Sequence, residues 1–523
     1  MRKEQEFTKP KKPRKIEKPE EIKIYSCPLL NELTTDIDIN LNYITEHFRD
    51  SSDIIYRPLT LGSKASYLIY LDGMIDRDLL SKSILPYLLA ANPSFYDNEL
   101  VEQIKNVLPV GEITLENSAS RVINSILDSH IIILLADSDK AVMISIPGLE
   151  KRGITEPDME QTIRGAKDSF TETLGINKTL IRRRLLHPDC KFHDITIGTY
   201  SRTCIAIVYI DSIVNKKLLA ELLHRLDRIK IDAVLDSNYL EELIEDSPYS
   251  IFPTTQITQR PDKAVSALLE GRMAVLIANV PYAIIVPALF VSFFQSAEDY
   301  YSRYIIGTFY RYLRYLGLLL TATLPAVFVA FTTFNQELLP TKFIISIAEQ
   351  RAGVPFPAAV EAILMGVAFE VLREAGTRLP RAIGQTISIV GALILGESAV
   401  SAGLVSPAMV IVTALTAITT FTIPFIQMYD PFLLMRIFLT LLSSFLGFWG
   451  IFIGLLLILG HLVSLRSLGI PYMTPLAPLK IEDLDDVLVR APQWTLKKRP
   501  GLLNKINQVR LNRNLKPGAN KSS

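Results

Sequence analysis

The charged residues of this chain are unevenly placed, and their distribution constrains the fold more than any other feature of the sequence. Most of them lie before residue 315 and after residue 478, and the region between these positions is strongly apolar. A run of about 20 apolar residues is long enough to cross a bilayer as a helix. We therefore expect a large soluble domain joined to an all-α, multi-span transmembrane domain.

Four apolar segments carry the membrane signal, at residues 315–334, 383–403, 409–426 and 436–465. The last of them would form a helix about 45 Å long, which is more than one perpendicular crossing needs. We expect it to bend or break at one of three glycines: Gly447, Gly450 or Gly454. An earlier apolar stretch, residues 273–294, is divided by Asn279 and Pro281, so we favour strand–turn–strand there over a membrane helix.

The segment 355–372 is ambiguous, because it is barely long enough to cross a membrane and carries two carboxylates. Glu361 and Glu370 are spaced so that they project from opposite sides of a helix. Each would cost about 2.5–3.5 kcal/mol at the bilayer centre, so we do not expect both to face lipid. An interfacial helix, or a helix buried among partner helices, fits better.

The sequence before residue 300 alternates between strand and helix patterns. Residues 130–148 hold two apolar runs around a polar turn, which predicts a hairpin. Residues 203–213 have the pattern of a buried strand, followed by a helix and by a further short strand at residues 231–237. This order is typical of an α/β fold whose subdomains have cores of their own.

The predicted organisation has five parts. Residues 1–30 are polar, proline-rich and basic, so we expect a disordered arm. Two α/β subdomains follow at residues 31–150 and 151–300, and the transmembrane domain occupies residues 301–470. Residues 471–523 form a basic cytoplasmic tail.

Basic residues near the spans predict the orientation. Arg303, Arg311 and Arg314 precede the first span, which places the N-terminal domain in the cytoplasm. The C-terminal tail is also basic, so both ends are expected inside and the number of crossings should be even, four or six. Five candidate segments are readily counted, so the sequence leaves the number of spans open.

No motif in the chain is typical of catalysis. It contains no glycine-rich phosphate loop, no GxSxG and no HExxH sequence, so we expect neither an enzyme nor a bound cofactor. His187, Cys190 and His193, with Cys204 further along, are ligand types that could hold zinc. Their spacing matches no standard ligand pair, and we favour ordinary loop and core positions over a metal site.

Three consecutive arginines, residues 182–184, allow an anion or nucleic-acid interpretation. No aromatic residues are interleaved with them, and the domain is not basic overall. We therefore favour a contact between domains or subunits and expect no nucleic-acid partner.

Small residues recur every four positions in the span 383–403, a pattern that lets membrane helices approach closely. This helix could pack within one protomer, pack between protomers around an axis, or line a polar conduction path. An acidic residue so close to an apolar span is a functional-site hypothesis by default. The candidate residues for an ion path or its gating are Ser388, Gly391, Gly396, Glu397 and Ser401.

Several stretches, in order along the chain, resemble the spore germination GerA family, and in particular its A-type subunits. They are the signature region at residues 355–424, together with "RGITEPDMEQTIRGAKDSFTETLGINKTLIRRRLLHPDCKF", "SIFPTTQITQRPDKAVSALLEGRMAVLIANVPYAIIVP" and "SAEDYYSRY". The resemblance covers roughly residues 60 to 480. The basic arms resemble those of the A subunits of K-type receptors more than those of the shortest members.

The resemblance implies a subunit of a nutrient germinant receptor in the inner membrane of a dormant spore. Such receptors combine A-type, B-type and C-type subunits, and the A-type subunit is thought to oligomerise into a ring and release ions when the nutrient binds. The chain departs from the family at residues 166–170, Ala-Lys-Asp-Ser-Phe, where members commonly carry Pro-Arg-Glu-Gly-Phe. A secondary transporter of a small solute or ion is the alternative function.

A dense cluster of charges separates the segment 355–372 from the span 383–403. In light of the resemblance it marks a hinge where a helix leaves the membrane, with charges that pair along the emerging face. The cluster could couple the soluble domain to the membrane helices, or it could be a plain positive-inside anchor, and both interpretations remain open. Its members are Glu370, Arg373, Glu374, Arg378 and Arg381.

Overall fold

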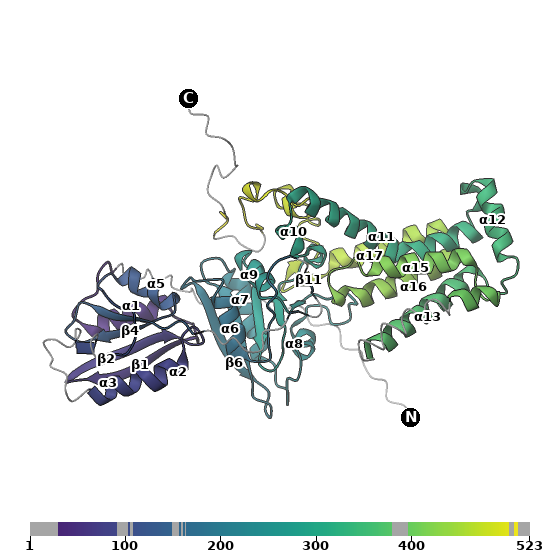
Figure 1. The fold of residues 1–523 in the computed structure, drawn as a ribbon. Coiled ribbons are helices and arrows are strands. Elements are labelled where there is room, and N and C mark those ends of the chain that lie inside the picture. Colours follow the sequence, from purple (N-terminus) through teal and green to yellow (C-terminus); the bar gives the residue numbers. More distant parts are fainter. Residues whose placement is uncertain are drawn as a thin grey trace, which may run out of the picture.

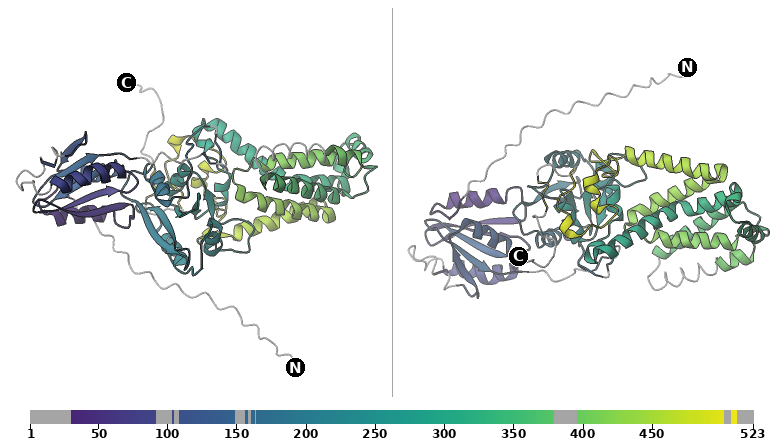
Figure 2. Two further views of the ribbon diagram at one scale, coloured as in Figure 1. Left: turned by 60° about the horizontal axis from the view of Figure 1, so that its bottom comes forward. Right: turned by 90° about the horizontal axis from the view of Figure 1, so that it is seen from above.

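The computed structural model describes residues 30–91, 103–104, 108–148, 156–157, 160–162, 164–378, 396–501 and 507–510. The chain forms three parts that follow one another in a row: two α/β subdomains and a helical bundle (Figure 1). Two further views show the second subdomain in the middle, between the first subdomain and the bundle (Figure 2). The predicted fold class is thus confirmed.

The first subdomain is an antiparallel sheet with helices on both faces. Its strands are β1 (Ile54–Leu61), β2 (Lys64–Leu71), β3 (Ile113–Glu116), β4 (His130–Leu135) and β5 (Ala141–Ser145), in the order β1-β2-β4-β5-β3. One face is covered by α1 (Ile37–His47) and α5 (Ala119–Leu127), and the other by α2 (Arg77–Leu79), residues 80–84 and α3 (Leu85–Ala91). Strands β4 and β5 are the predicted hairpin.

The second subdomain is built in the same way. Its strands are β6 (Cys190–Ile197), β7 (Thr203–Ile210), β8 (Gln256–Thr258), β9 (Met273–Ile277) and β10 (Ala283–Val286), in the order β6-β7-β9-β10-β8. Helices α6 (Leu174–Arg182) and α9 (Pro261–Leu269) cover one face, and α7 (Lys216–Asp227) and α8 (Ser237–Ile244) the other. The strand–turn–strand prediction for residues 273–294 is confirmed by β9 and β10.

The two subdomains repeat one another in detail. In each sheet the strands lie in the order first, second, fourth, fifth and third. Thr34 and Asn40 exchange a pair of hydrogen bonds of 2.9 and 2.6 Å, and Thr171 and Asn177 repeat that pair at 2.7 and 2.6 Å. The hairpin residues after β4 and β9 also match, since Asp137 and Asn279 both have positive φ. The second unit is therefore a structural copy of the first.

The prediction of a short strand at residues 231–237 is wrong. The backbone carbonyls of Ile231 and Asp232 accept hydrogen bonds from Thr199 and Tyr200 in the turn between β6 and β7. Val234 fills the core as a single buried side chain, and its carbonyl accepts a bond from the hydroxyl of Thr203. Val234 thus packs into the core beside the sheet, whereas Leu235 is exposed, and the segment does not join the sheet as a strand.

The helical bundle follows the second subdomain. Its helices are α11 (Tyr304–Thr333), α12 (Thr341–Arg351), α13 (Ala358–Arg378), α15 (Pro407–Thr420), α16 (Tyr429–Leu446) and α17 (Phe448–Ser464). Within the described part, α11 and the segment Ile426–Leu446 are long and apolar enough to cross a membrane, and α15 and α17 are shorter apolar helices. Large apolar side chains such as Phe445, Trp449 and Leu457 are exposed on the bundle, as expected of a surface that faces lipid.

The long apolar run at residues 436–465 breaks at Gly447, as predicted. This residue has φ +58°, a conformation that favours glycine, and the chain reverses there. Helices α16 and α17 then pack so closely that a Cβ at Gly450 would lie 2.2 Å from the carbonyl oxygen of Leu442. One run counted as a single segment is therefore a pair of helices.

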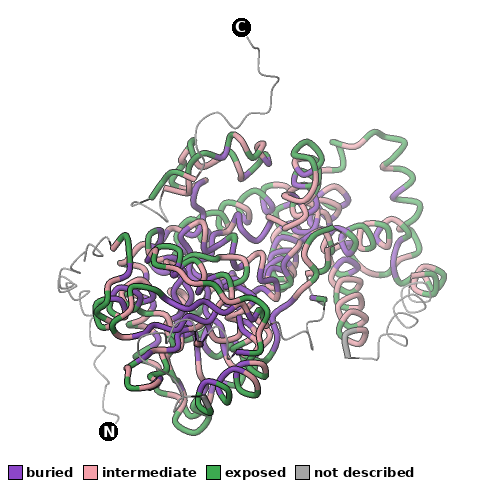
Figure 3. The backbone as a smooth tube through the Cα atoms, turned by 60° about the vertical axis from the view of Figure 1, so that its left-hand side comes forward, coloured by how far each residue is buried: buried purple, intermediate pink, exposed green. Residues whose placement is uncertain are grey.

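The chain returns to the second subdomain after α17. Strands β11 (Arg466–Ser467) and β12 (Ile470–Pro471) form a small hairpin, and Tyr472 is fully buried against Phe290 and Phe293. The hydroxyl of Ser250 also lies 3.0 Å from the ring of His461, near the end of α17. Buried residues, purple in Figure 3, run through the α/β part of the chain and on into the helical bundle. The start of α11 and the end of α17 thus meet the same subdomain.

Candidate functional site

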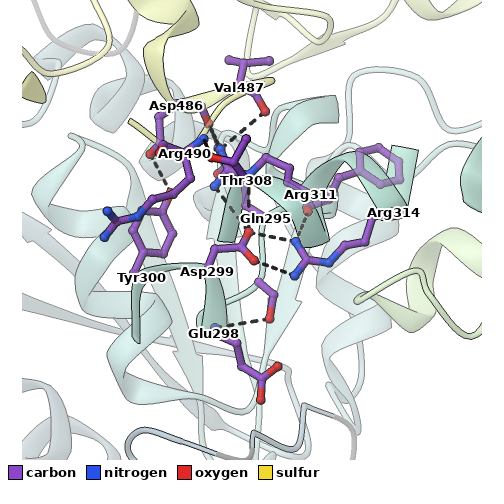
Figure 4. Close-up of polar contacts among 12 residues, drawn as sticks. Gln295, Glu298, Asp299, Tyr300, Thr308, Arg311, Arg314, Asp486, Val487 and Arg490 are labelled. Carbon is purple, nitrogen blue, oxygen red and sulfur yellow. Dashed lines mark hydrogen bonds and ion pairs between the residues drawn. The ribbon is translucent and has the colours of Figure 1, made fainter. Parts of the chain in front are cut away.

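A cluster of buried charges joins the second subdomain to the first helix of the bundle (Figure 4). Helix α10 (Glu298–Tyr301) carries Asp299, whose side chain is fully buried. Helix α11 presents Arg311 and Arg314 from one face, because residues three apart lie side by side on a helix. Arg314 binds Asp299 through two bonds of 2.6 and 2.8 Å, and Arg311 lies 3.4 Å from the same carboxylate.

The C-terminal segment completes this cluster. Arg311 donates from Nη1 to the carboxylate of Asp486 at 3.0 Å and to its backbone carbonyl at 2.6 Å. Tyr300 donates its hydroxyl to the other oxygen of Asp486 at 2.6 Å, and Gln295 donates to the Asp486 carbonyl at 2.7 Å. Burial, together with the charge of Asp486, raises the pKa of Tyr300, so this phenol stays protonated as a donor. We call Asp299, Arg311, Arg314 and Asp486 the junction cluster.

The junction cluster is closed and balanced. Two guanidinium groups meet two carboxylates, and removing one partner of such a buried set leaves an uncompensated charge. The helices also approach closely here, because a Cβ at Gly307 would lie 2.8 Å from the carbonyl oxygen of Asp299. The cluster fixes α10, α11 and the C-terminal segment relative to one another. It therefore suits a rigid link better than a catalytic site.

A second set of charges lies inside the bundle, on α13. Glu361 is fully buried and accepts from the backbone N–H and the hydroxyl of Ser406 at 3.0 and 2.9 Å. Its other oxygen lies 3.3 Å from Nε of Arg351 on α12. This carboxylate thus ties α12 and α13 to the N-terminus of α15, in agreement with a helix buried among partners.

Glu370 projects from the opposite side of α13 toward α16. It pairs with Arg373 at 2.8 Å, an ion pair that the i, i+3 spacing allows, and with Arg436 of α16 at 3.0 Å. Arg373 also lies 3.8 Å from Asp430. A cavity of 550 Å³ adjoins these groups, and its lining includes Glu374, Thr413, Thr416 and Thr440 among mostly apolar residues.

The remaining predicted site residues are only partly placed. Ser388, Gly391 and Arg381 lie outside the described residues, and of Arg378 only the helical backbone at the end of α13 is described. Glu397 and Ser401 are exposed in the single chain. A Cβ at Gly396 would meet Val410 of α15 at 3.6 Å, an ordinary packing distance.

The histidines and cysteines considered as zinc ligands do not converge. Cys190 and His193 lie three apart on strand β6 and so face opposite sides of the sheet. Cys190 is fully buried in the core, and burial raises the pKa of its thiol to about 11. Among the described residues, no group of three potential ligands is close enough to hold a metal ion.

Two of the three clustered arginines make internal contacts. Arg182 is 1% exposed and binds Asp53 of the first subdomain through bonds of 2.8 and 3.0 Å, so the prediction of an interdomain contact is confirmed for this residue. Arg184 binds Asp168 of its own subdomain at 2.6 and 2.7 Å. Arg183 is exposed.

Comparison with known proteins identifies the family. Residues 42–502 match the model of the Bacillus/Clostridium GerA spore germination protein. The chain belongs to the GerA family. This result confirms the resemblance seen in the signature region.

Relatives within the GerA family match along almost their whole length. Spore germination protein KA of Bacillus subtilis is 42% identical over 89% of this chain and 86% of its own. Spore germination protein GerLA of Bacillus cereus is 36% identical over 90% of this chain and 96% of its own. A crystal structure of the N-terminal domain of the A subunit of the Bacillus megaterium germinant receptor GerK3 is 29% identical, covers 50% of this chain and 98% of that chain, and has a TM-score of 0.39.

The residues that depart from the common GerA pattern are well integrated in this chain. The carbonyl of Ala166 accepts a bond of 3.0 Å from Arg260, and Asp168 binds Arg184. Phe170, which the common pattern shares, is buried. The junction cluster, by contrast, was missed by sequence reasoning. Arg311 and Arg314 were noted only as markers of orientation, although their spacing places them on one helix face.

Proposed function

We propose that this chain is the A-type subunit of a nutrient germinant receptor in the spore inner membrane, where it acts with B-type and C-type subunits and triggers germination without being an enzyme. Membership of the GerA family is the observation that carries this proposal. The names of its relatives, which are spore germination proteins, support it.

The proposed subunit is a multi-pass protein whose N-terminal domain lies in the cytoplasm. The arginines before the first span support this orientation through the positive-inside rule. Helix α11 begins, and α17 ends, against the second subdomain, which favours an even number of crossings. The division of residues 436–465 into α16 and α17 supplies the additional helix that an even number requires.

We further propose that the subunit oligomerises and forms or gates an ion path. Close packing of the small-residue span 383–403 between protomers would place Glu397 and Ser401 near the axis, since both are exposed in the single chain. The cavity between α13, α15 and α16 lends support, because two carboxylates, Glu370 and Glu374, line an otherwise mostly apolar space within the bundle.

Ion release from spores tests this function. We expect Glu397→Gln and Glu370→Gln to change nutrient-triggered ion release at normal protein levels, because each removes charge and little volume. Glu349→Gln, on the exposed surface of α12, is the matched control and should behave as the unmodified chain. A larger residue in Gly391→Leu should abolish the response or leave the path leaky, because packing losses typically cost about 1–3 kcal/mol. Unaltered ion release in all of these variants would contradict an ion path through this chain.

A further inference from the structure

A separate cavity of 230 Å³ lies in the second subdomain, next to the junction cluster. Its walls come from α9, from the turn that follows α9, from α10 and from the C-terminal segment. The charged and phenolic groups of the lining include Asp262, Lys263, Glu270, Arg272, Tyr300 and Asp486. The space corresponds to roughly seven water molecules, or to a small metabolite.

Two of the three cations in the wall, Lys263 and Arg272, have unused donors; the third is Arg510 of the C-terminal segment. Arg272 is only 6% exposed and reaches Glu270 at 3.2 Å, but its Nε is buried and has no hydrogen-bond partner among the residues that the structure describes. Lys263 donates one bond, of 3.2 Å, to the carbonyl of Gln295 and lies 3.4 Å from the ring centre of Phe425. Burial lowers the pKa of Lys263 to about 8, because desolvation disfavours the charged form of the amine.

The three carboxylates of the wall are already engaged, Glu270 by its ion pair with Arg272 at 3.2 Å. Asp262 accepts two bonds from Arg260, at 2.7 and 3.0 Å, and another from Tyr301. Asp486 accepts from Tyr300 and Arg311 as part of the junction cluster. The cavity therefore offers free positive donors more than free acceptors, and buried donors of this kind favour an anionic ligand.

The first subdomain shows that the cover over this cavity is an addition to the fold. Its matching positions are Arg121 for Lys263 and His130 for Arg272, as the equivalent strand registers establish. The Arg121 side chain is 73% exposed and pairs with Glu116 at the surface. Only in the second unit do α10 and the C-terminal segment lie over the pair of cations and enclose a space between them.

We propose that this cavity binds a small metabolite through its carboxylate or phosphate group, held between Lys263 and Arg272. The planar fork of arginine and the point charge of lysine both suit such an oxyanion. The bound group would be sensed by the junction, because Lys263 contacts Gln295, Gln295 donates to Asp486, and Asp486 accepts from Arg311 of α11. This last step rests on the proposed receptor function, whereas binding itself does not.

Calorimetric titration of the purified full-length protein in detergent tests the site. Acetate and inorganic phosphate serve as probes at constant ionic strength, with chloride as the balancing anion. We expect saturable binding of at least one probe, and the preferred probe identifies the group that the cavity recognises. Lys263→Met and Arg272→Gln should weaken binding about tenfold or more, because each removes a buried charged partner. Arg121→Gln, the surface equivalent in the first subdomain, should bind as the unmodified protein does.

Unfolding midpoints without ligand control for the fold of each variant. Lys263 is less buried than Arg272, so Lys263→Met keeps the test decisive even where Arg272→Gln fails to fold. Absence of saturable binding for both probes overturns the proposal, and so does binding by folded Lys263→Met that equals that of the unmodified protein. If the unmodified protein binds a probe and Lys263→Met does not, but Lys263→Met spores still respond normally to nutrient, the result counts against sensing through the junction and not against the site.

Discussion

The two α/β subdomains share one topology but have very different surroundings. The first subdomain lies at one end of the molecule, and its Arg121 is at the surface. The second lies between the first subdomain and the bundle, and α10 and the C-terminal segment enclose its equivalent positions. Since the sheets are alike, the contacts that distinguish the second unit come from chain segments outside the repeat. Those segments are where we expect the function that depends on the soluble domain.

The buried junction should respond most strongly to mutation. Arg311→Ala leaves Asp486 without its guanidinium partner and Asp299 with Arg314 alone, and breaking a buried charge set of this kind typically costs about 3–5 kcal/mol. Arg121→Ala removes an exposed pair in the first subdomain and should cost less than about 1 kcal/mol. Thermal unfolding of both purified variants measures the difference, and equal losses would break the contrast between the two units.

The contact between the two subdomains is the next test. Arg182→Met leaves Asp53 buried and unpaired, so we expect the units to separate at a cost of about 3 kcal/mol. Limited proteolysis between the two sheets should then be faster, while the second sheet stays protected. Arg183→Met, at the exposed neighbouring position, should be cleaved at the original rate. Unchanged proteolysis in Arg182→Met would show that other contacts hold the units together.

A smaller effect is expected where α10 and α11 touch. Gly307→Ala forces a Cβ to within 2.8 Å of the Asp299 carbonyl oxygen, and such overpacking costs about 1–3 kcal/mol. Gly460→Ala on α17 is the control, because no described atom lies within 4 Å of its Cβ position. Alanine should stabilise that helix slightly. A Gly307→Ala protein as stable as Gly460→Ala would mean that the close approach does not constrain the junction.

Local patterns predicted much of this structure, and long-range pairing accounts for most of what was missed. The hairpins at β4–β5 and β9–β10 were predictable because apolar runs flank polar turn residues, and Gly447 was one of the positions expected to break the long apolar run. The strand prediction for residues 231–237 failed because Val234 enters the core from a loop while Leu235 is exposed. The partnership of Asp486 with Arg311 has no local signature, since the carboxylate lies in a turn-rich segment far along the chain.

The repeat of the two subdomains was also missed, for a related reason. The repeat shows in strand register and turn geometry more than in identical residues. Arg121 and Lys263, for example, occupy equivalent positions but are different residues. The sequence did contain a signal for the partnership of Arg436. This arginine is an isolated charge in an apolar helix, and such residues usually have a specific partner. Its partner, Glu370, was in fact among the predicted residues.

The central claim is that the junction cluster links the soluble domain to the helices that control ion release. Nutrient-triggered ion release from spores carrying Asp486→Asn tests it most directly, with Asp485→Asn at the exposed neighbouring position as the control. Asparagine keeps the shape of Asp486 but removes the charge that Arg311 binds. We predict, at equal protein levels, an abolished, delayed or constitutive release for Asp486→Asn and normal release for Asp485→Asn. Normal release from both would contradict the account.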